Sequence, residues 1–260
     1  MWMNAFKACV AVALFGVAYL STSAFSRVPN ITSLMAFFIS GVVGLNIGDI
    51  YLMKAFSRIG SARTLIIFSF QPIFLGLFGY FIFGQVVDPR KAVAIFFMMA
   101  CLFIMSYEKF RLDGRWELKG PLYAGIGVLL DSCGILLTRF AFDADQEVSV
   151  IEGNFYRCIG AITGFFIMAQ VRPFKLVETY KKMKLKSKLV VTAAAVLGTF
   201  VSLTLYLNAI RYGNLAAVTA IVGTGPIFAA ILESVITKKA PSIYLYLSLS
   251  LFGMGFYLLF

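Results

Sequence analysis

Long apolar runs alternate with short polar connections along the whole chain of 260 residues. Each run is long enough for an α-helix that crosses the hydrocarbon core of a bilayer, which takes about 20 residues. The pattern therefore predicts an all-α, polytopic membrane protein. The nine predicted spans lie at approximately 4–25, 32–57, 63–84, 91–107, 120–141, 152–171, 188–209, 215–237 and 242–260.

Composition agrees with this environment, since 60% of the residues are hydrophobic and 13% are charged. The short connections supply too little polar sequence to cover a water-soluble domain. The net charge of +11 sits mainly in these connections, where Lys and Arg orient helices and meet anionic headgroups, so nucleic acid is not expected as a partner. The four cysteines lie in apolar runs without paired spacing, which indicates packing rather than a disulfide framework, a metal site or a cofactor site.

The sequence also contains an internal repeat. An Asn-x-x-Lys/Arg pattern occurs at Asn4 and Lys7 and again at Asn154 and Arg157, near the starts of the first and sixth spans. Because of this match we interpret the first span as part of a repeated design, although a secretory signal would also place Lys7 before an apolar stretch. At an offset of 154 residues, Gly44, Ala55, Ala62, Pro72, Ile73 and Phe74 match Gly198, Ala209, Ala216, Pro226, Ile227 and Phe228.

The two copies of each repeated span lie five spans apart, so the second copy crosses the membrane in the opposite direction. Such an inverted repeat, with parts at 1–107 and 120–260, indicates a transporter whose substrate binds near the bilayer midplane. Pro72 and Pro226 interrupt equivalent helices and would each free a backbone carbonyl, which at membrane depth is tolerated only against protein or a wet cavity. A kink that only shapes helix packing is the alternative.

These features resemble the EamA-type transporters of the drug/metabolite transporter superfamily. "GDIYLMKAFSRIGSAR" followed by "QPIF", and "LYLNAIRYGNLAA" followed by "GPIF", look like the two copies of the family's paired helices. The resemblance covers essentially the whole chain and implies ten helices in two inverted sets of five. The first helix of this chain corresponds to the second helix of the family. The family's Glu at the end of the Pro-containing helix is replaced by Gln85 and Lys239, so no role for that carboxylate is carried over.

Ionisable residues inside the spans are the main functional candidates, because a charge near the bilayer centre costs roughly 2.5 to 3.5 kcal/mol on insertion scales. Asp131 lies in the middle third of the fifth span and is a candidate for contacting substrate or carrying a proton. Asp49 shares a helical face with Asn46, so we expect it to face protein or a cavity. A structural ion pair, with Lys54 or a neighbouring helix, is the alternative for Asp49.

Lys7 and Arg157 occupy equivalent places near two helix starts, and in the resembling fold these helices flank the central cavity. A cationic pair there would suit a carboxylate-bearing or otherwise anionic metabolite. Snorkelling to the headgroups is the alternative. Further residues that either line a path or only pack in the helices are Asn4, Asn154, Gln71, Tyr206 and Asn208.

The favoured function is a secondary transporter, acting as an exporter of a small metabolite or drug-like compound by alternating access. Its expected partners are the substrate, the lipid bilayer and a proton or counter-substrate, and its expected location is a bacterial cytoplasmic (inner) membrane. A passive channel and a non-transporting membrane subunit are the alternatives. An enzyme is disfavoured because the chain has no His and no Ser or Cys beside a plausible base, and the acidic "DAD" at 143–145 is interpreted as solvated charge.

Basic residues are distributed unequally between the two sides. With Lys7 and Arg157 set aside, sixteen lie in the connections of one side and five in those of the other. This imbalance predicts that the 172–188 connection is cytoplasmic and the C-terminus external, whereas the resemblance implies an internal C-terminus. The five basic residues on the less basic side are Arg27, Arg90, Lys91, Arg139 and Arg211.

The two halves differ in one element. The second half has a span at 120–141, which carries Asp131, whereas nothing precedes Asn4 in the first half. We therefore expect about 20 to 25 further apolar residues to be encoded upstream in frame. A second chain that fills the gap is the alternative.

Overall fold

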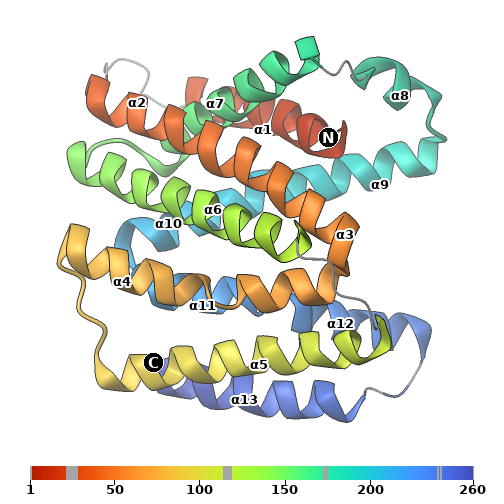
Figure 1. Ribbon diagram of the computed structural model, residues 1–260. Helices are drawn as coiled ribbons and strands as arrows, with labels where there is room; N and C mark the ends of the chain where they lie inside the picture. Colours follow the sequence, from red (N-terminus) through yellow and green to blue (C-terminus); the bar gives the residue numbers. More distant parts are fainter. Residues whose placement is uncertain are drawn as a thin grey trace. The chain divides into compact units, whose positions relative to one another are not determined.

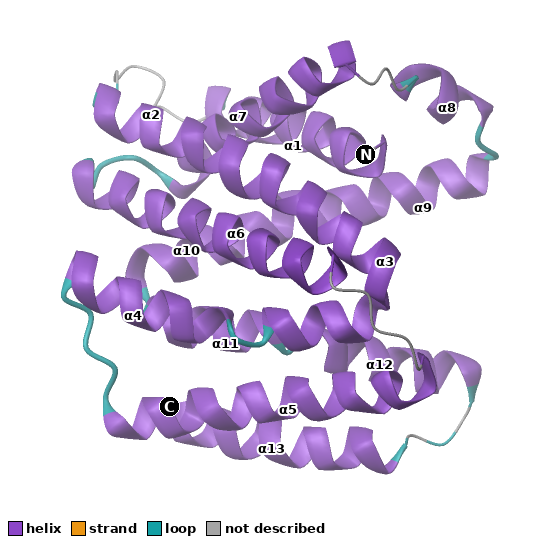
Figure 2. Ribbon diagram, viewed as in Figure 1, coloured by secondary structure: helices purple, strands orange, loops and turns teal. Residues whose placement is uncertain are grey.

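The computed structural model of the protein describes residues 2–21, 29–113, 119–171, 175–238, 240 and 242–259. In this part of the chain all regular secondary structure is helical, and no strand occurs (Figure 2). The predicted all-α fold is confirmed.

The helices form two compact units, and each unit takes helices from both halves of the sequence (Figure 1). Unit 1 comprises Met1–Ile50 and Cys133–Tyr212, and unit 2 comprises Tyr51–Ser132 and Gly213–Phe260. Two helices begin in one unit and end in the other, namely α3 (Asp49–Phe68) and α6 (Lys119–Ala144).

Unit 1 is arranged around α7, which packs against α1, α2, the π-helix η2 and α10. The rings of Phe37 and Phe142 meet edge to face in its core, with centroids 4.9 Å apart. The helices of unit 1 are α1 (Trp2–Leu20), α2 (Ile31–Ser40), η2 (Gly41–Gly48), α7 (Val150–Val171), α8 (Leu176–Lys182), α9 (Leu185–Ala195), the π-helix η3 (Val196–Val201) and α10 (Ser202–Tyr212).

In unit 2, α5 packs along α13, and α11 packs against α4 and α5. Gly255 permits the close approach of α13 to α5, because a Cβ atom there would lie 3.0 Å from the carbonyl oxygen of Ala94. The helices of unit 2 are α4 (Gln71–Phe83), α5 (Pro89–Asp113), α11 (Leu215–Gly223), α12 (Gly225–Thr237) and α13 (Ile243–Leu259).

Each predicted span coincides with helix, within the described residues. Residues 22–25, at the end of the first span, lie outside the described residues. The second span continues past its predicted end at 57, and the helix is interrupted only at Gly60, whose φ of 75° is a left-handed conformation that favours glycine. The connection after the sixth span contains the short helix α8, which the hydropathy pattern did not predict.

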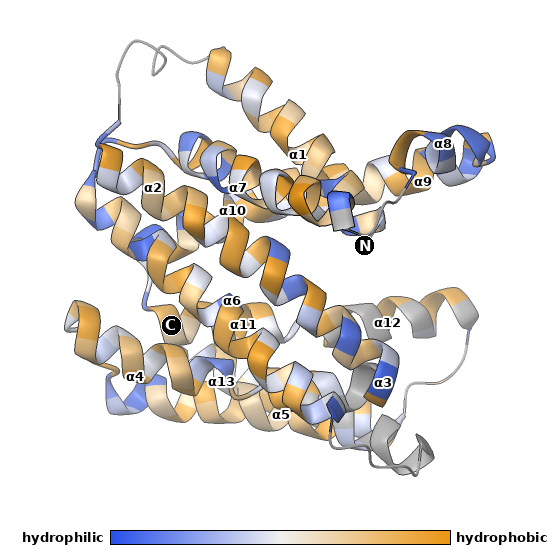
Figure 3. Ribbon diagram, turned by 45° about the horizontal axis from the view of Figure 1, so that its top comes forward, coloured by the Kyte–Doolittle hydropathy of each residue, from blue (hydrophilic) through white to orange (hydrophobic). Residues whose placement is uncertain are grey.

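Within the described part of the chain, four helical stretches are long and apolar enough to cross a membrane: Trp2–Leu20, Ile31–Gly60, Lys119–Ala144 and Leu185–Tyr212. Figure 3 shows hydrophobic residues along most of the helices, whereas α8 is largely hydrophilic. Many large apolar side chains are exposed, among them Val17, Phe81, Leu189 and Val235. Apolar surface on this scale fits contact with lipid.

The third and eighth spans are broken into two helices each. Pro72 and Pro226 do not interrupt a continuous helix, as the sequence predicted, but stand in the first turns of α4 and α12. Proline is tolerated at this position because the first N–H groups of a helix have no intrahelical partner. The two breaks share one hydrogen-bond pattern: Phe70 N–H donates to Ile67 and Ile73 N–H to Phe70, while Thr224 N–H donates to Ile221 and Ile227 N–H to Thr224.

The second and seventh spans also share a local feature. Each contains a π-helical segment, η2 at Gly41–Gly48 and η3 at Val196–Val201. The two π-helical segments occupy equivalent positions when the halves are aligned at an offset of 154 residues, the offset at which Gly44 matches Gly198. The two helix breaks are equivalent at the same offset. The sequence repeat is therefore accompanied by a repeat of local backbone structure.

Glycines let η2 and the end of α2 touch neighbouring helices directly. A Cβ atom at Gly41 would lie 1.8 Å from the carbonyl oxygen of Arg157, and one at Gly160 would lie 2.1 Å from that of Phe38. Backbone cannot yield as a flexible side chain does, so these positions accept only glycine at this separation. Gly41 thus packs directly against α7, and Gly44 against Gly134 of α6.

The "DAD" stretch differs from the sequence interpretation in one residue. Asp143 is exposed and pairs with Arg139, with N and O atoms 3.2 Å apart. Asp145, in contrast, is buried and accepts hydrogen bonds from the backbone N–H groups of Asn30 and Glu147. Its carboxylate joins two loops of unit 1, so the interpretation as solvated charge is wrong for Asp145.

Candidate functional site

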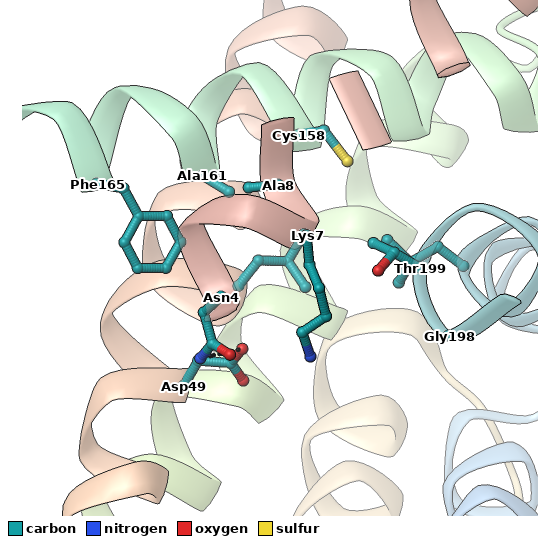
Figure 4. A pocket seen from close by; sticks show the side chains of 11 residues that line it. Asn4, Lys7, Ala8, Asp49, Cys158, Ala161, Phe165, Gly198 and Thr199 are labelled. Carbon is teal, nitrogen blue, oxygen red and sulfur yellow. Dashed lines mark hydrogen bonds between the residues drawn. The ribbon is translucent and has the colours of Figure 1, made fainter. Parts of the chain in front are cut away.

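A cavity of about 150 Å³, with a mainly apolar lining and a few polar side chains, lies in unit 1 (Figure 4). It is bounded by α1, α7, the starts of α3 and α10, and both π-helical segments. The lining residues are Asn4, Lys7, Ala8, Leu45, Asp49, Cys158, Ala161, Phe165, Gly198, Thr199 and Leu203. Three residues predicted as functional candidates, Asn4, Lys7 and Asp49, are therefore brought together here.

Asn4 and Asp49 form a polar pair at one end of this cavity. The amide Nδ2 of Asn4 donates to the carboxylate Oδ2 of Asp49 at 3.3 Å. Lys7 lies one helical turn from Asn4 on α1 and extends its ammonium into the same space (Figure 4). The Lys54 ammonium lies over the Tyr51 ring, 4.8 Å from its centroid.

Asn154 makes the equivalent contact in the second half. Its Nδ2 donates to the backbone carbonyl of Leu203 at 3.1 Å, and Leu203 corresponds to Asp49 at the offset of 154 residues. The repeated Asn thus has the same structural role in both copies, which is to join the first helix of its pair to the end of a π-helical segment. Only the first copy presents a carboxylate at that point.

Both π-helical segments contribute to the wall of the cavity. Leu45 comes from η2, and Gly198 and Thr199 come from η3. The hydroxyl of Thr199 is buried and has no hydrogen-bond partner within the described residues. A buried hydroxyl without a partner is costly unless water or a ligand satisfies it. Short π-helical segments in proteins are frequently found at functional sites.

Arg157 is not among the residues that line this cavity, unlike its sequence counterpart Lys7. Its side chain is buried at 2% exposure, and its Nε donates to the hydroxyl of Ser40 at 3.0 Å. The same hydroxyl lies 2.7 Å from both the carbonyl of Gly134 and the hydroxyl of Thr138. Arg157 is therefore part of a buried polar cluster that joins α2, α6 and α7, and the expected cationic pair at one cavity is not formed.

Asp131 and Gln71 meet in unit 2. Gln71 is buried at the helix break before Pro72, and its Nε2 donates to Oδ2 of Asp131 at 2.7 Å. The side chain at the break thus has a partner in the membrane-buried carboxylate of α6. Two of the predicted candidates are brought together at a discontinuous helix, which is a common setting for transporter binding sites.

The remaining candidates have simpler environments. Tyr206 is half-buried and packs against the core cluster around Phe37 and Phe142. Asn208 is exposed on α10. The side chain of Pro226 lies outside the described side chains, although its backbone is in α12. No group of three metal-ligating side chains occurs among the described residues.

Sequence reasoning did not identify Thr199 or Gly198 as site residues. The match of Gly44 with Gly198 aligns two spans, and by itself it does not indicate that Gly198 lines a cavity. Threonine and glycine within an apolar span carry no charge signal, so only the repeat pointed to this position.

Comparison with known proteins agrees with the fold and the repeat. The sequence profile of the EamA-like transporter family matches residues 1–107 and 118–260. A solved structure named only "Crystal structure of protein" is 15% identical, and it aligns with a TM-score of 0.79 over 99% of this chain and 85% of that chain. At this identity the likeness shows the fold alone. No curated protein matches the chain at a significant level.

The apolar helices, the broken spans and the repeated local structure together define a polytopic integral membrane protein. The chain belongs to the EamA-like transporter family. The predicted resemblance is confirmed, and membership indicates a multi-pass transporter of drugs or metabolites.

Proposed function

We propose that the protein is a secondary transporter that exports a small metabolite or drug-like compound, and that the substrate binds in the cavity of unit 1. The observation that carries the proposal is the meeting of two repeat-related π-helical segments at one cavity that also contains Lys7 and Asp49. Charged side chains at membrane depth are costly and usually mark substrate or ion pathways.

The size and chemistry of the cavity define the kind of substrate. A volume of about 150 Å³ favours a small metabolite. The Lys7 ammonium would bind a carboxylate or another anionic group of the substrate, and the Thr199 hydroxyl would supply a further hydrogen bond. Asp49, held by Asn4, is the proposed carrier of a coupling proton.

Alternating access in this proposal uses the repeated parts of the fold. Residues 1–107 and 120–260 act as two inverted repeats, and their π-helical segments and helix breaks are the places where hydrogen bonds rearrange at least cost. The Gln71–Asp131 contact at the first break is a second candidate for coupling. The proposed location is a bacterial cytoplasmic membrane.

Growth of cells on a panel of toxic metabolites and analogues tests this function. An exporter raises resistance to compounds that it carries, and Lys7→Gln abolishes that resistance without loss of protein from the membrane. Lys91→Gln, at an exposed lysine of α5, is the matched control and retains resistance. Equal sensitivity with and without the protein over the whole panel would contradict the export function.

A further inference from the structure

The connection between α7 and α9 carries an unusual concentration of charge for this chain. Residues 175–188 contain six lysines and one glutamate, a net charge of +5. Five of the six lysines are exposed, namely Lys175, Lys181, Lys182, Lys184 and Lys186. This lysine surface, defined as residues 175–188, is positioned by the helices α8 and α9 of unit 1.

The single glutamate organises α8 rather than neutralising the surface. Glu178 accepts from Lys182 at 2.7 Å and pairs with Lys175 at 2.9 Å. The hydrogen bonds from Lys182 and Lys175 hold the pKa of Glu178 below its ordinary value, so it stays ionised and both lysines remain close to α8. The other four lysines of the surface leave a strong excess of positive charge.

Apolar and aromatic side chains adjoin these lysines. Val177, Leu185 and Leu189 are all exposed by more than half of their area, at 61%, 73% and 64%. Tyr180 lies beneath the Lys188 ammonium, 5.6 Å from its ring centroid. Lysines interleaved with exposed aliphatic side chains and Tyr or Trp are typical of segments that lie at the headgroup level of a bilayer.

The lysine surface is also attached to the helix that carries the cavity residues. The indole N–H of Trp2 donates to the carbonyl of Leu176 at 3.0 Å. The rings of Trp2, Phe6 and Tyr180 stack in sequence, with centroids 5.3 and 5.1 Å apart. A shift of α8 therefore acts directly on the first two turns of α1, the turns from which Asn4 and Lys7 enter the cavity.

We infer that residues 175–188 form a binding surface for anionic phospholipid headgroups, and that lipid bound there controls the position of Asn4 and Lys7 through the Trp2–Phe6–Tyr180 stack. The binding part stands on charge, exposure and aromatic placement alone. The control part rests on the proposed function, because it needs the cavity to be the substrate site. Headgroup phosphates are chosen over soluble polyanions because exposed aliphatic side chains accompany the lysines.

Titration of the purified full-length protein in neutral detergent tests the binding part. Phosphatidylglycerol is expected to raise the midpoint of thermal unfolding, and phosphatidylcholine to leave it unchanged. Because each lysine near an anionic surface contributes about fivefold in affinity, the triple variant Lys181→Gln, Lys184→Gln, Lys186→Gln should need at least about tenfold more phosphatidylglycerol. Added salt should reduce the response.

The matched control is Lys91→Gln, Lys119→Gln, Lys238→Gln, which removes three exposed lysines from unit 2. It should respond to phosphatidylglycerol as the unmodified protein does. An equal response of the 181/184/186 variant, or an equal effect of phosphatidylcholine, would overturn the lipid surface. A midpoint rise at lower concentrations of polyglutamate or an RNA oligonucleotide than of phosphatidylglycerol would assign the surface to a soluble partner and likewise overturn it.

Transport in liposomes tests the control part. The unmodified protein should transport at least about threefold faster in phosphatidylglycerol-containing liposomes than in phosphatidylcholine alone. Phe6→Leu removes the ring that joins Tyr180 of α8 to Trp2 of α1 and leaves residues 175–188 unchanged, so it should still bind phosphatidylglycerol while its transport no longer depends on the lipid. A normal midpoint response of this variant shows that it is folded.

Failure of the lipid control can be distinguished from failure of the proposed transport function. Transport that is independent of lipid composition in the unmodified protein overturns the control part and leaves the proposed function standing. Absence of transport in every liposome contradicts the proposed function and the control part together, while the midpoint titration still decides whether the lipid surface exists.

Discussion

At the scale of single residues, the two copies of the Asn-x-x-Lys/Arg pattern share one contact and differ in another. Asn4 and Asn154 make equivalent contacts, as the repeat implies. Lys7 lines the cavity, whereas Arg157 is buried against Ser40. Position along a helix follows from the sequence, but the direction in which a long side chain extends depends on the packed neighbours, which periodicity does not contain.

The first prediction separates the roles of these two cations. Arg157→Gln should lower the free energy of unfolding by about 1–3 kcal/mol, because it breaks a buried hydrogen-bond cluster. Lys7→Gln should leave stability nearly unchanged and reduce transport, because Lys7 is a half-buried cavity residue. Thermal unfolding and transport of both variants are the measurements. A stable but inactive Arg157→Gln would return Arg157 to the candidate site.

The second prediction concerns the two membrane-buried carboxylates. Asp49→Asn and Asp131→Asn keep side-chain size but remove the titratable group, so protein levels should remain near normal while transport falls or changes its pH dependence. Asp88→Asn, at an exposed aspartate before α5, is the matched control. Transport that is unchanged across pH in both test variants would leave these carboxylates with structural roles only.

At the scale of helices, the sequence predicted the existence of most elements but not their local backbone form. The prolines marked the third and eighth spans as interrupted, yet they begin α4 and α12 instead of bending one helix. The π-helical segments have no sequence signal of their own, since their form depends on contacts such as that of Gly41 with α7. Helix α8 was missed because seven residues rich in lysine give no apolar periodicity.

The third prediction tests the close approach of α7 to α2. Gly160→Ala places a Cβ atom 2.1 Å from the carbonyl oxygen of Phe38, and overpacking of this kind costs about 1–3 kcal/mol. Gly253→Ala, where nothing lies within 4 Å, is the control and should be neutral or slightly stabilising, because alanine favours helix. Equal unfolding midpoints of the two variants would contradict the described packing.

The fourth prediction concerns the pH response of α8. The folded-state pKa of Glu178 is lowered from 4.5 by its hydrogen bonds to Lys182 and then Lys175. The carboxylate therefore stabilises α8 above its ordinary pKa, and this contribution is lost as pH falls through the lowered folded-state value. Titration of the Glu178 side-chain carboxyl by NMR should show a pKa below 4.5. A value at or above 4.5 would show that the two lysines do not hold it.

At the scale of the whole molecule, hydropathy predicted the class of protein, and the resemblance of the repeated motifs to EamA-type transporters predicted the family. The compact units could not be predicted, because each combines helices from both halves, such as α1 with α7 in unit 1 and α5 with α13 in unit 2. Apolar helix faces pack wherever they fit, irrespective of order in the chain. The division into repeats at 1–107 and 120–260 stays a prediction. It divides the sequence into two consecutive parts and does not coincide with the two compact units.

The fifth prediction is the orientation in the membrane. The excess of basic residues places the 172–188 connection in the cytoplasm and the C-terminus outside. The same orientation would place the lysine surface at the more anionic leaflet. A C-terminal alkaline phosphatase fusion should be active, and a C-terminal fluorescent protein dark. A fusion that is active only in the cytoplasm would reverse the orientation, as the family resemblance implies.

The most direct test of the central claim is accumulation of a substrate, found in the resistance panel, by proteoliposomes with an imposed proton gradient. The cavity account predicts accumulation above the external concentration, collapse on addition of a proton ionophore, and loss in Lys7→Gln with retention in Lys91→Gln. Passive equilibration without accumulation would indicate a channel. Accumulation by Lys7→Gln at the rate of the unmodified protein would show that the substrate binds elsewhere.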